Sequence, residues 1–424
     1  MKRKVILLLL IVVIAVTAVS FTACDNEGEY ADLVGIRVNG RMAEWEDISY
    51  NFSYEGEGVL NVSVPYTNYL EITDLILSPG ATGIVYSDKE YSQKIEDTSK
   101  IHTDGDKTLY IRVENGKTSH DYAINVKVSN ENLPEGDLSA KEYDNRGGHV
   151  YIPENAETVT VDGVEYNVIW GTKEESGYGF NPSKIKGNSI LARDLIFYNY
   201  SVGSKDDAYA NVFDGNGYTI TLDGDVSTIF YTLAESGVFR NAYISRNPYY
   251  DNSVNTIYNY LGQIAIYNSG TIDNVHYDCE ISVWSLDRYY IERGGYAIGR
   301  VGIYTSENSG TIKNCINYGS LLSGFREGGK YCLEAGVFAS YSKGATYENC
   351  INMGNMENYV VDASWVYGVY STSFFADENT SVKGVYNLGN VETEEKYYDS
   401  YNGFFGEIYM NKSIDLSTTR DYTK

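Results

Sequence analysis

The chain has 424 residues, of which 43% are hydrophobic and 14% are aromatic, and it carries a formal net charge of -25. Its length exceeds that of one ordinary compact domain, and its hydrophobic content excludes a disordered polymer. An acidic surface of this kind repels phosphate backbones, so no nucleic acid is expected among its partners.

The N-terminus has the pattern of a targeting segment. Lys2, Arg3 and Lys4 precede an apolar run over residues 5–16, and small residues lead to Phe-Thr-Ala-Cys at residues 21–24. Basic, then apolar, then small residues are typical of a cleaved signal peptide, and the run is short for a membrane-spanning helix. The sequence Phe-Thr-Ala-Cys resembles the lipobox of bacterial lipoproteins, with Phe in place of the usual Leu.

This resemblance implies a lipoprotein signal peptide over residues 1–23 and a lipid on Cys24, which would become the mature N-terminus. Acyl chains would tether the protein to the bacterial cell membrane, at about 0.8 kcal/mol per buried methylene group. The expected location is therefore extracytoplasmic, lipid-anchored and surface exposed. Residues 24–32 are polar and acidic, and they form the expected tether.

Residues 33–130 alternate apolar and polar side chains in short runs. Asn-Gly or Pro-Gly follows several of these runs, which cover residues 33–38, 59–64, 72–77, 109–113 and 122–128. Alternation at period two with such turns predicts antiparallel strands and hairpins, and this length suits a two-sheet sandwich. The ending VENGKTSHDYAINVKV resembles the closing hairpin of cadherin-like or immunoglobulin-like domains. We expect this domain to act as a stalk or spacer.

A polar linker is expected over residues 131–147, and a repeat region over residues 148–424. One pattern recurs as ESGVFRNAYIS, NSGTIDNVHYDCEIS, NSGTIKNCINYGSLLSG, SKGATYENCINMGNMEN and SVKGVYNLGNVE. Its copies lie 33, 40, 35 and 35 residues apart when they are aligned on Ala242, Val275, Cys315, Cys350 and Val385. A nearly fixed period, whose copies differ only by the length of a loop, indicates a repeat architecture in which no unit can bury its apolar face alone.

Residues 188–406 resemble the right-handed β-helices of bacterial surface proteins that carry GLUG-type repeats. The likeness rests on a Gly-led strand before each Asn-containing copy, and these strands begin at Gly262, Gly299, Gly336 and Gly368. In the last copy Gly384 stands in the Asn position. The resemblance implies an all-β chain in which a β-sandwich is followed by a right-handed parallel β-helix, a solenoid. The 41 Gly and 42 Tyr residues fit a fold made of strands and tight turns.

The repeated residues suit the interior and the corners of a solenoid. Ile312, Cys315 and Ile316 are expected to point inward, with Gly and Asn where the chain turns sharply. The aligned Asn side chains would lie above one another in a hydrogen-bonded ladder, formed by Asn241, Asn274, Asn314 and Asn349.

Two cysteines occupy the same repeat position. Cys315 and Cys350 should therefore lie in adjacent rungs, about 4.8 Å apart. Parallel side chains fit the dihedral angle of a disulfide poorly, so we expect buried reduced thiols. The sequence alone leaves open the redox state of the cysteines after the signal peptide, Cys279, Cys315, Cys332 and Cys350.

Aromatic residues concentrate in the segments where the repeats differ. In a solenoid, insertions at one point of the period emerge on one side, and Tyr and Trp stack well on sugar faces or protein hydrophobes. We therefore predict a ligand-facing edge made of Tyr249, Tyr250, Trp284, Tyr289, Tyr290, Tyr359, Trp365, Tyr397 and Tyr398. The alternative is that these rings only cap the ends of the core.

The sequence offers no catalytic motif. Glycoside hydrolysis needs two carboxylates about 5 to 9.5 Å apart. No acid pair occupies neighbouring turns at the position before the ladder Asn, which reads Arg240, Asp273, Lys313 and Glu348. The Asp-containing turns at residues 104–106 and 214–217 resemble calcium loops without the downstream acidic ligand, and the four His lack metal spacing. No catalytic residue, metal or cofactor is expected.

The sequence therefore predicts a non-catalytic binding or adhesion protein that recognises a glycan or another surface protein outside the cell. The alternative is a β-helix carbohydrate-active enzyme, either a polysaccharide lyase or a glycosidase, whose acids converge only in the folded chain. Acids that converge at the aromatic edge would favour the enzyme. A ring-lined groove without them would favour the binding protein.

Overall fold

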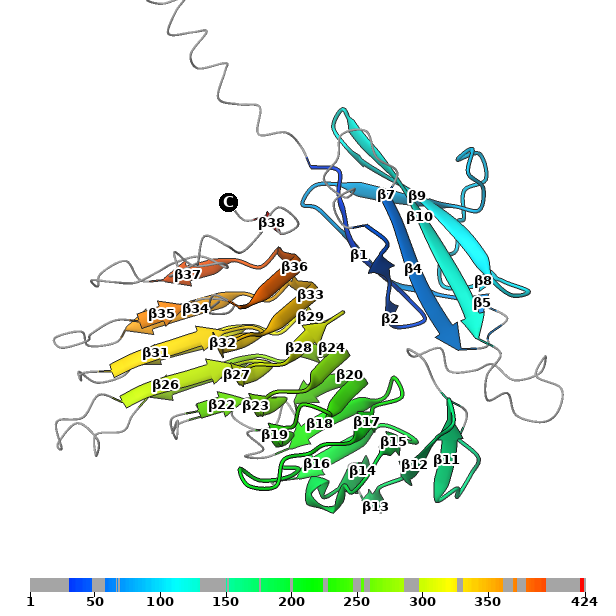
Figure 1. Ribbon diagram of the computed structural model, residues 1–424. Coiled ribbons are helices and arrows are strands. Elements are labelled where there is room, and N and C mark those ends of the chain that lie inside the picture. Colours follow the sequence, from blue (N-terminus) through cyan, green and yellow to red (C-terminus); the bar gives the residue numbers. More distant parts are fainter. Residues whose placement is uncertain are drawn as a thin grey trace, which may run out of the picture.

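The protein is all-β in the computed structural model. An N-terminal unit and a larger repeat unit lie side by side (Figure 1). The signal peptide, Cys24 and the linker predicted at residues 131–147 lie outside the described residues, so the domain boundaries stay predictions. The structure describes residues 30–47, 58–65, 67, 69–129, 150, 152–174, 177–198, 201–223, 228–246, 253–254, 260–285, 297–325, 331–360, 369–371, 379–393 and 420–422.

The N-terminal unit has two main sheets, ordered β2-β1-β6 and β3-β4-β10-β9-β7, and a ribbon in which β5 pairs with β8. Its strands are β1 (Leu33–Val38), β2 (Arg41–Met42), β3 (Glu44–Trp45), β4 (Gly58–Pro65), β5 (Tyr69–Leu70), β6 (Ile72–Leu77), β7 (Thr82–Tyr86), β8 (Ile101–His102), β9 (Lys107–Asn115) and β10 (Thr118–Ser129). All five predicted apolar runs are strands. The prediction of antiparallel pairing was wrong for β4 and β10, which run parallel, because no hairpin joins them.

Alternate residues of the two sheets form the core of the N-terminal unit. Leu60 and Val62 of β4 pack with Leu109 of β9 and Ile124 of β10, while Ile36 of β1 joins them from the other sheet. The strand β1 is buried on both faces. One face therefore completes the N-terminal core, and the other faces the repeat unit.

The repeat unit consists of strands that pair in parallel between successive copies. We number its four sheets in the order in which the chain enters them within each copy. Sheet I is β22-β26-β31-β35, sheet II is β19-β23-β27-β32, sheet III is the 15-stranded sheet around β20-β24-β28-β33-β36, and sheet IV is β21-β25-β30-β34-β37. The chain passes from sheet I to IV and then begins again one rung further on (Figure 1).

The first part of the repeat unit contains β11 (Thr158–Val161), β12 (Val164–Ile169), β13 (Thr172–Glu174), β14 (Gly177–Phe180), the 3₁₀ helix η3 (Pro182–Lys184), β15 (Ser189–Leu191), β16 (Leu195–Tyr198), β17 (Val212–Asp214), β18 (Thr219–Asp223), β19 (Phe230–Leu233), β20 (Val238–Arg246), β21 (Ser253–Val254), β22 (Tyr260–Gly262) and β23 (Ala265–Asn268). Two antiparallel hairpins, β11-β12 and β13-β14, form its beginning. Every later pairing in sheet III is parallel.

The later copies contain β24 (Thr271–Asp278), β25 (Ile281–Ser285), β26 (Ala297–Gly302), β27 (Thr305–Asn308), β28 (Thr311–Lys313), β29 (Ile316–Asn317), β30 (Leu321–Phe325), β31 (Tyr331–Gly336), β32 (Ala339–Ser342), β33 (Thr346–Asn352), β34 (Met356–Val360), β35 (Val369–Ser371), β36 (Ser381–Asn387), β37 (Val391–Thr393) and β38 (Arg420–Asp421). The strand register confirms the predicted alignment. Ala242 pairs with Val275, and Cys350 pairs with Val385. Flanking pairs bring Cys315 into the same column.

The predicted strand starts were wrong, because Gly262 and Gly336 are the last residues of β22 and β31, and Gly299 lies inside β26. Gly302, and not Gly299, stands in register with Gly262 and Gly336. The reason is steric, because an added Cβ at Gly302 would lie 1.7 Å from the carbonyl oxygen of Thr305, and one at Gly262 would lie 1.9 Å from that of Ala265. Only Gly fits this corner of the repeat. Gly368 lies outside the described residues.

The predicted Asn ladder forms as two separate pairs. Asn274 Nδ2 donates to Asn241 Oδ1 at 3.1 Å, and Asn349 Nδ2 donates to Asn314 Oδ1 at 2.9 Å. All four residues have φ between 51° and 55°, a left-handed conformation that Asn tolerates better than other non-Gly residues. Gly384 continues the column at φ 62°, which explains why Gly can replace Asn there.

A second Asn ladder was missed by the sequence analysis. Asn317 Nδ2 donates to Asn352 Oδ1 at 2.7 Å, and Asn352 Nδ2 donates to Asn387 Oδ1 at 2.8 Å. Each amide also donates to the carbonyl oxygen two residues later, which belongs to Gly319, Gly354 or Gly389. These buried amides thus fix the turn that leads into sheet IV.

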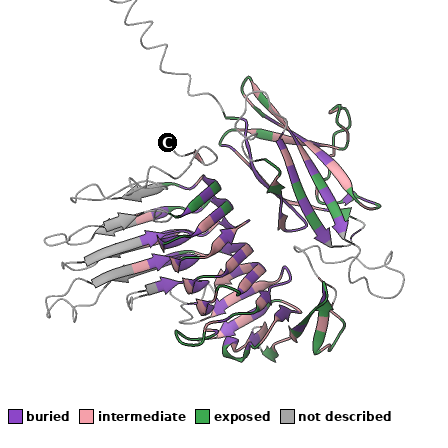
Figure 2. Cartoon of the chain, viewed as in Figure 1, coloured by how far each residue is buried: buried purple, intermediate pink, exposed green. Residues whose placement is uncertain are grey.

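The interior of the repeat unit is apolar and continuous. Ile312 and Cys315 lie in it, as predicted, together with Phe239, Ile272 and Val385. In Figure 2 the buried residues form bands across successive strands. The thiols of Cys315 and Cys350 are buried and unpaired, as expected, and Cys279 is also unpaired. The side chain of Cys332 lies outside the described residues.

The prediction that Ile316 points inward was wrong. Ile316 is fully buried, but it packs outward with Ile351 and Tyr386 against Val34 and Met42 of the N-terminal unit. The left-handed residue before Cys315 turns the chain, so Cys315 and Ile316 face opposite sides of the strand. Sequence periodicity showed that both are apolar, but not that another unit covers one of them.

The two units contact each other closely. An added Cβ at Gly35 of β1 would lie 2.5 Å from Ile351 Cδ1 and 2.5 Å from Met42 Cε, so β1 packs closely against the repeat unit and a larger residue would have to displace these side-chain ends. The Asn ladder is interrupted between Asn274 and Asn314 at the same contact. Asn314 Nδ2 donates to Glu44 Oε1 at 2.8 Å, and the backbone N–H of Met42 donates to Asn274 Oδ1 at 3.2 Å.

Candidate functional site

Most of the predicted aromatic site lies outside the described residues. This holds for Tyr249, Tyr250, Tyr289, Tyr290, Trp365, Tyr397 and Tyr398, and for the side chains of Trp284 and Tyr359. The backbones of Trp284 and Tyr359 belong to β25 and β34 of sheet IV. Both pair with Gly324 of β30, so the two positions are in register two rungs apart.

Chain order relates the other aromatic positions to sheet IV. Tyr289 and Tyr290 come between the sheet IV strand β25 and the sheet I strand β26, and Trp365 comes between β34 and β35. Tyr397 and Tyr398 follow the sheet IV strand β37. Tyr249 and Tyr250 differ, because they precede the first sheet IV strand, β21. The aromatic edge stays a prediction.

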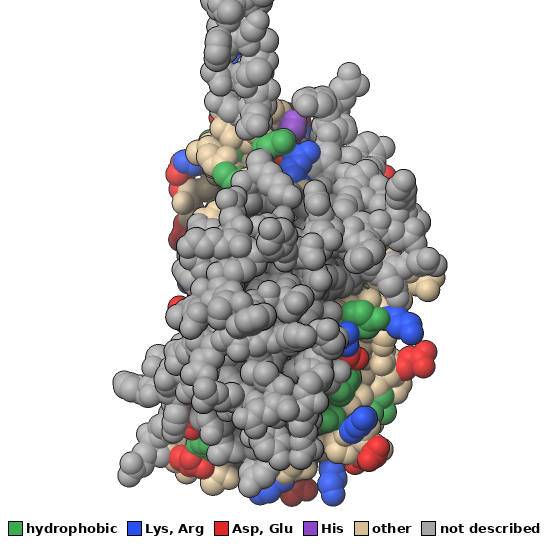
Figure 3. Space-filling model, turned by 90° about the vertical axis from the view of Figure 1, so that its left-hand side faces the viewer, with side chains coloured by type: hydrophobic (Ala, Val, Ile, Leu, Met, Phe, Trp, Pro, Cys, Tyr) green, Lys and Arg blue, Asp and Glu red, His purple; other side chains and the backbone are tan. Residues whose placement is uncertain are grey.

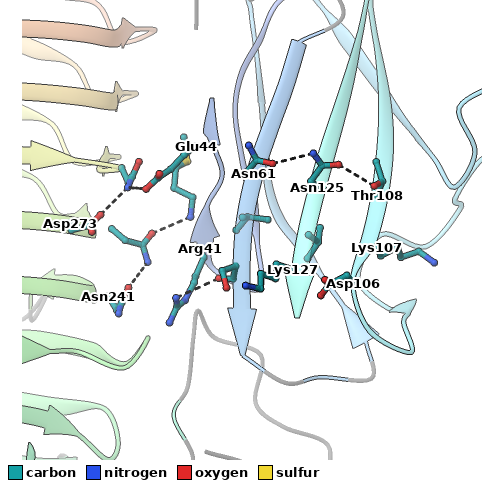
Figure 4. Close-up of a pocket in the computed structure, with 16 residues that line it drawn as sticks. Arg41, Glu44, Asn61, Asp106, Lys107, Thr108, Asn125, Lys127, Asn241 and Asp273 are labelled. Atoms are coloured by element: carbon teal, nitrogen blue, oxygen red, sulfur yellow. Dashed lines mark hydrogen bonds between the residues drawn. The ribbon is translucent and has the colours of Figure 1, made fainter. Parts of the chain in front are cut away.

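A polar groove of about 600 Å³ lies between the two units among the described residues. Figure 4 shows the repeat unit on one side, with Asn241 and Asp273, and the N-terminal unit on the other. We name it the interunit groove and define it by its lining residues, Arg41, Met42, Glu44, Asn61, Val62, Ser63, Asp106, Lys107, Thr108, Asn125, Val126, Lys127, Asn241, Asp273, Asn274 and Asn314.

A row of amides and a hydroxyl crosses the N-terminal wall of the groove. Asn125 Nδ2 donates to Asn61 Oδ1 at 3.1 Å, and Thr108 Oγ1 donates to Asn125 Oδ1 at 3.1 Å. The three residues come from β10, β4 and β9, which are neighbours in one sheet (Figure 4). Their alternation with core residues such as Ile124 turns them outward. The row therefore presents donors and acceptors at fixed spacing.

Two carboxylates, Glu44 from the N-terminal unit and Asp273 from the repeat unit, meet at one amide. Asn314 Nδ2 donates to Glu44 Oε1 at 2.8 Å and to Asp273 Oδ1 at 2.9 Å. Lys313 Nζ lies 3.3 Å from Asp273 Oδ2. Burial opposes the charge on Lys313, but Asp273 and Glu44 outweigh it and raise the pKa of its ammonium group.

Basic side chains balance these acids. Arg41, Lys107 and Lys127 line the groove, as does the acidic Asp106. Burial, with Arg240 nearby, lowers the pKa of the Arg41 guanidinium. Its Nη1 donates to the carbonyl oxygen of Ser63 at 3.5 Å. The groove thus combines hydrogen-bonding amides with charges of both signs, and none of its described lining residues is aromatic.

The described residues contain no group of three or more His, Cys, Asp or Glu side chains that could hold a metal ion. Nor does the described part of the chain include a helix long and apolar enough to span a membrane. On the face in Figure 3, the basic and acidic side chains of the described residues are interspersed.

Comparisons with known proteins give no relative. No protein-family model matches the chain. Neither a curated protein nor a solved structure shows significant similarity to it.

The interunit groove was not predicted from the sequence. Asp273 and Asn314 were assigned to the repeat column, and Asn61 and Asn125 were read only as polar positions of alternating strands. Asn61, Thr108 and Asn125 occupy outward positions of three strands, but Glu114 and Lys127 do so as well, and residue type alone does not mark the row. Nothing in the sequence pattern shows that these strands face the Asn ladder.

Proposed function

We propose that the protein is a lipid-anchored, surface-exposed bacterial binding protein that holds a polyhydroxylated ligand of the glycan class in the interunit groove. The observation that carries the proposal is the polar lining of the groove. Amides from Asn61 and Asn125 and charges of both signs are the groups that hydrogen-bond sugar hydroxyls. A groove of about 600 Å³ has the size of a small-ligand site.

The proposed architecture is a β-sandwich followed by a right-handed parallel β-helix with GLUG-type repeats. The parallel pairing of successive copies, the return of the chain to sheet I after each sheet IV strand, and the stacked amides support a solenoid. The face-to-face core of the N-terminal sheets supports the sandwich. In this arrangement the sandwich forms one wall of the site, in addition to its role as a spacer.

The anchor is proposed from the sequence at residues 21–24. Lipidation of Cys24 would place the N-terminal unit next to the membrane and the groove outside the cell. Metabolic labelling with a fatty acid analogue should mark the wild-type chain. The change Cys24→Ala should abolish the label, and labelling that persists would remove the lipid anchor from the proposal.

Binding can be tested on immobilised glycans with the chain from residue 25 onwards, which contains every described residue. The double change Asn61→Ala and Asn125→Ala should lower retention at least tenfold, because it removes the amide row. Asn211→Ala is a matched control, since Asn211 is exposed and lies outside the groove. Retention that the double change leaves intact would contradict the proposed site.

The contact at Asn314 favours glycoside hydrolysis as a second candidate function. The oxygens of Glu44 and Asp273 that share this amide lie no farther apart than the sum of their two hydrogen bonds, 2.8 and 2.9 Å. This upper limit allows the separation of roughly 5 Å that the carboxyl groups of retaining glycosidases have. Release of reducing ends by the wild type, abolished by Glu44→Gln and by Asp273→Asn, would establish the enzyme. Retention without release favours the binding protein.

A further inference from the structure

A second groove lies at the beginning of the repeat unit, far in sequence from the interunit groove. It has a volume of about 640 Å³ and is lined by residues between 167 and 198. We name it the end groove. It lies between the two hairpins that begin the repeat unit, since its lining includes Asn167 and Ile169 of β12 and Thr172 and Glu174 of β13.

We infer that the end groove binds a pyranose ring of a saccharide. This inference concerns a separate site and rests on the proposed function only in taking a glycan as the ligand. It is carried by three features that occur together, namely an apolar floor, half-buried aromatic rings and a polar rim.

The floor and the rings offer surface for the apolar face of a sugar. Ile169 and Ile185 are buried in the core of the repeat unit, and both line the groove. Trp170, Phe180 and Tyr198 also line it, and all three are half-buried, so each is exposed in part. Aromatic rings bury a large apolar area at low cost in side-chain entropy.

Neighbouring groups hold these rings in place. Trp170 Nε1 donates to the carbonyl oxygen of Ala156 at 2.8 Å. The Arg193 guanidinium lies 4.9 Å from the centre of the Trp170 ring. Tyr198 donates its hydroxyl hydrogen bond to Glu174. A site whose rings are already fixed loses little entropy when the ligand binds.

Polar groups surround the floor. Asn181 caps the 3₁₀ helix η3, and its side chain lines the groove beside Lys184, the last residue of that helix. Lys186 adds a second cation, and Glu174 adds one acid. These groups can hydrogen-bond ring hydroxyls. The two exposed lysines would favour a sugar that carries a carboxylate over a neutral one.

The inference can be tested by titrating the chain from residue 25 onwards with two probes, a neutral cello-oligosaccharide and an oligogalacturonate. The change Thr172→Trp fills the groove without removing a ring, because Thr172 is an exposed lining residue. It should raise the Kd for whichever probe binds by at least tenfold. Thr158→Trp is the matched control, because Thr158 is exposed on β11 and lies outside the groove. It should leave the Kd within twofold.

The lysines distinguish the two sugar classes. Removing both in Lys184→Ala/Lys186→Ala should weaken oligogalacturonate three- to tenfold and leave the neutral probe unchanged. An unchanged Kd in Thr172→Trp, with loss of binding in Asn61→Ala/Asn125→Ala, would overturn the end groove and leave the proposed function standing. A wild-type chain that binds no saccharide in either this titration or the glycan screen would overturn both.

Discussion

The Asn ladder ends on a buried group that lacks a partner. Asn349 Oδ1 is buried without a hydrogen-bond donor among the described residues, and the next position of the column is Gly384. In both intact pairs the later Asn donates Nδ2 to Oδ1 of the earlier one. The change Gly384→Asn should therefore extend the ladder by placing a donor next to Asn349 Oδ1.

The expected gain follows from three contributions. A hydrogen bond that satisfies a buried amide oxygen contributes about 0.5 to 1.5 kcal/mol. Replacing Gly restricts the unfolded chain and adds roughly 0.4 to 1 kcal/mol where the backbone is compatible. The backbone at residue 384 suits Asn, because Gly384 has φ 62°, close to the 51° to 55° of the ladder Asn residues. The left-handed conformation still has a cost, but this cost is smaller for Asn than for other side chains. We expect Gly384→Asn to raise the free energy of unfolding by about 1 kcal/mol.

Thermal and denaturant unfolding of the chain from residue 25 onwards would measure this change. Gly384→Ala is the control, since Ala suffers the cost of the left-handed conformation, about 1 to 2 kcal/mol, and offers no amide. The Asn variant should unfold at a higher temperature than the wild type, and the Ala variant at a lower one. If Gly384→Asn destabilises the protein as much as Gly384→Ala does, the reasoning about the ladder is wrong.

Three further predictions concern stability. Asn314→Gly should lower the free energy of unfolding by about 3 kcal/mol in urea titrations, because it removes two hydrogen bonds to carboxylates without backbone strain; a loss below about 1 kcal/mol would refute this. Gly354→Ala should cost about 3 kcal/mol or more in thermal unfolding, since its Cβ would lie 1.9 Å from the Gly319 carbonyl oxygen, and a wild-type Tm would contradict this. Burial, and then the charge of Arg37, lower the pKa of His276 well below 6.5, so the folded state binds fewer protons than the unfolded one. The free energy of unfolding should therefore be highest above about pH 6.5 and should fall at lower pH by up to about 1.4 kcal/mol per pH unit. The change His276→Ile should reduce this dependence of stability on pH.

The repeat unit was predictable from the sequence because its period fixes its register. The columns of Ala242 and Cys315 and the left-handed Asn residues follow from a recurring pattern that local sterics explain. The second ladder was also readable, since Asn-x-Gly recurs at the same interval at Asn317, Asn352 and Asn387. The prediction instead followed the apolar residues beside each Asn, which fit the interior of a repeat.

The contact between the units was not predictable from periodicity. An apolar residue such as Ile316 could be buried inside the repeat unit or against a second unit. Only the position of β1 shows that the N-terminal unit covers it. The break in the ladder between Asn274 and Asn314 has the same origin, because Met42 and Glu44 take their hydrogen bonds. The interunit groove follows from this contact, so its residues come from segments that no sequence spacing relates.

The central claim is that a glycan binds between the two units, and hydrogen exchange with and without a retained glycan would test it most directly. The account predicts slower amide exchange on binding in β2, β3, β9 and β10 and in residues 273–274, with little change in the outer strand β7. Protection confined to segments outside the interunit groove, with no change around Asn125 and Asp273, would contradict it.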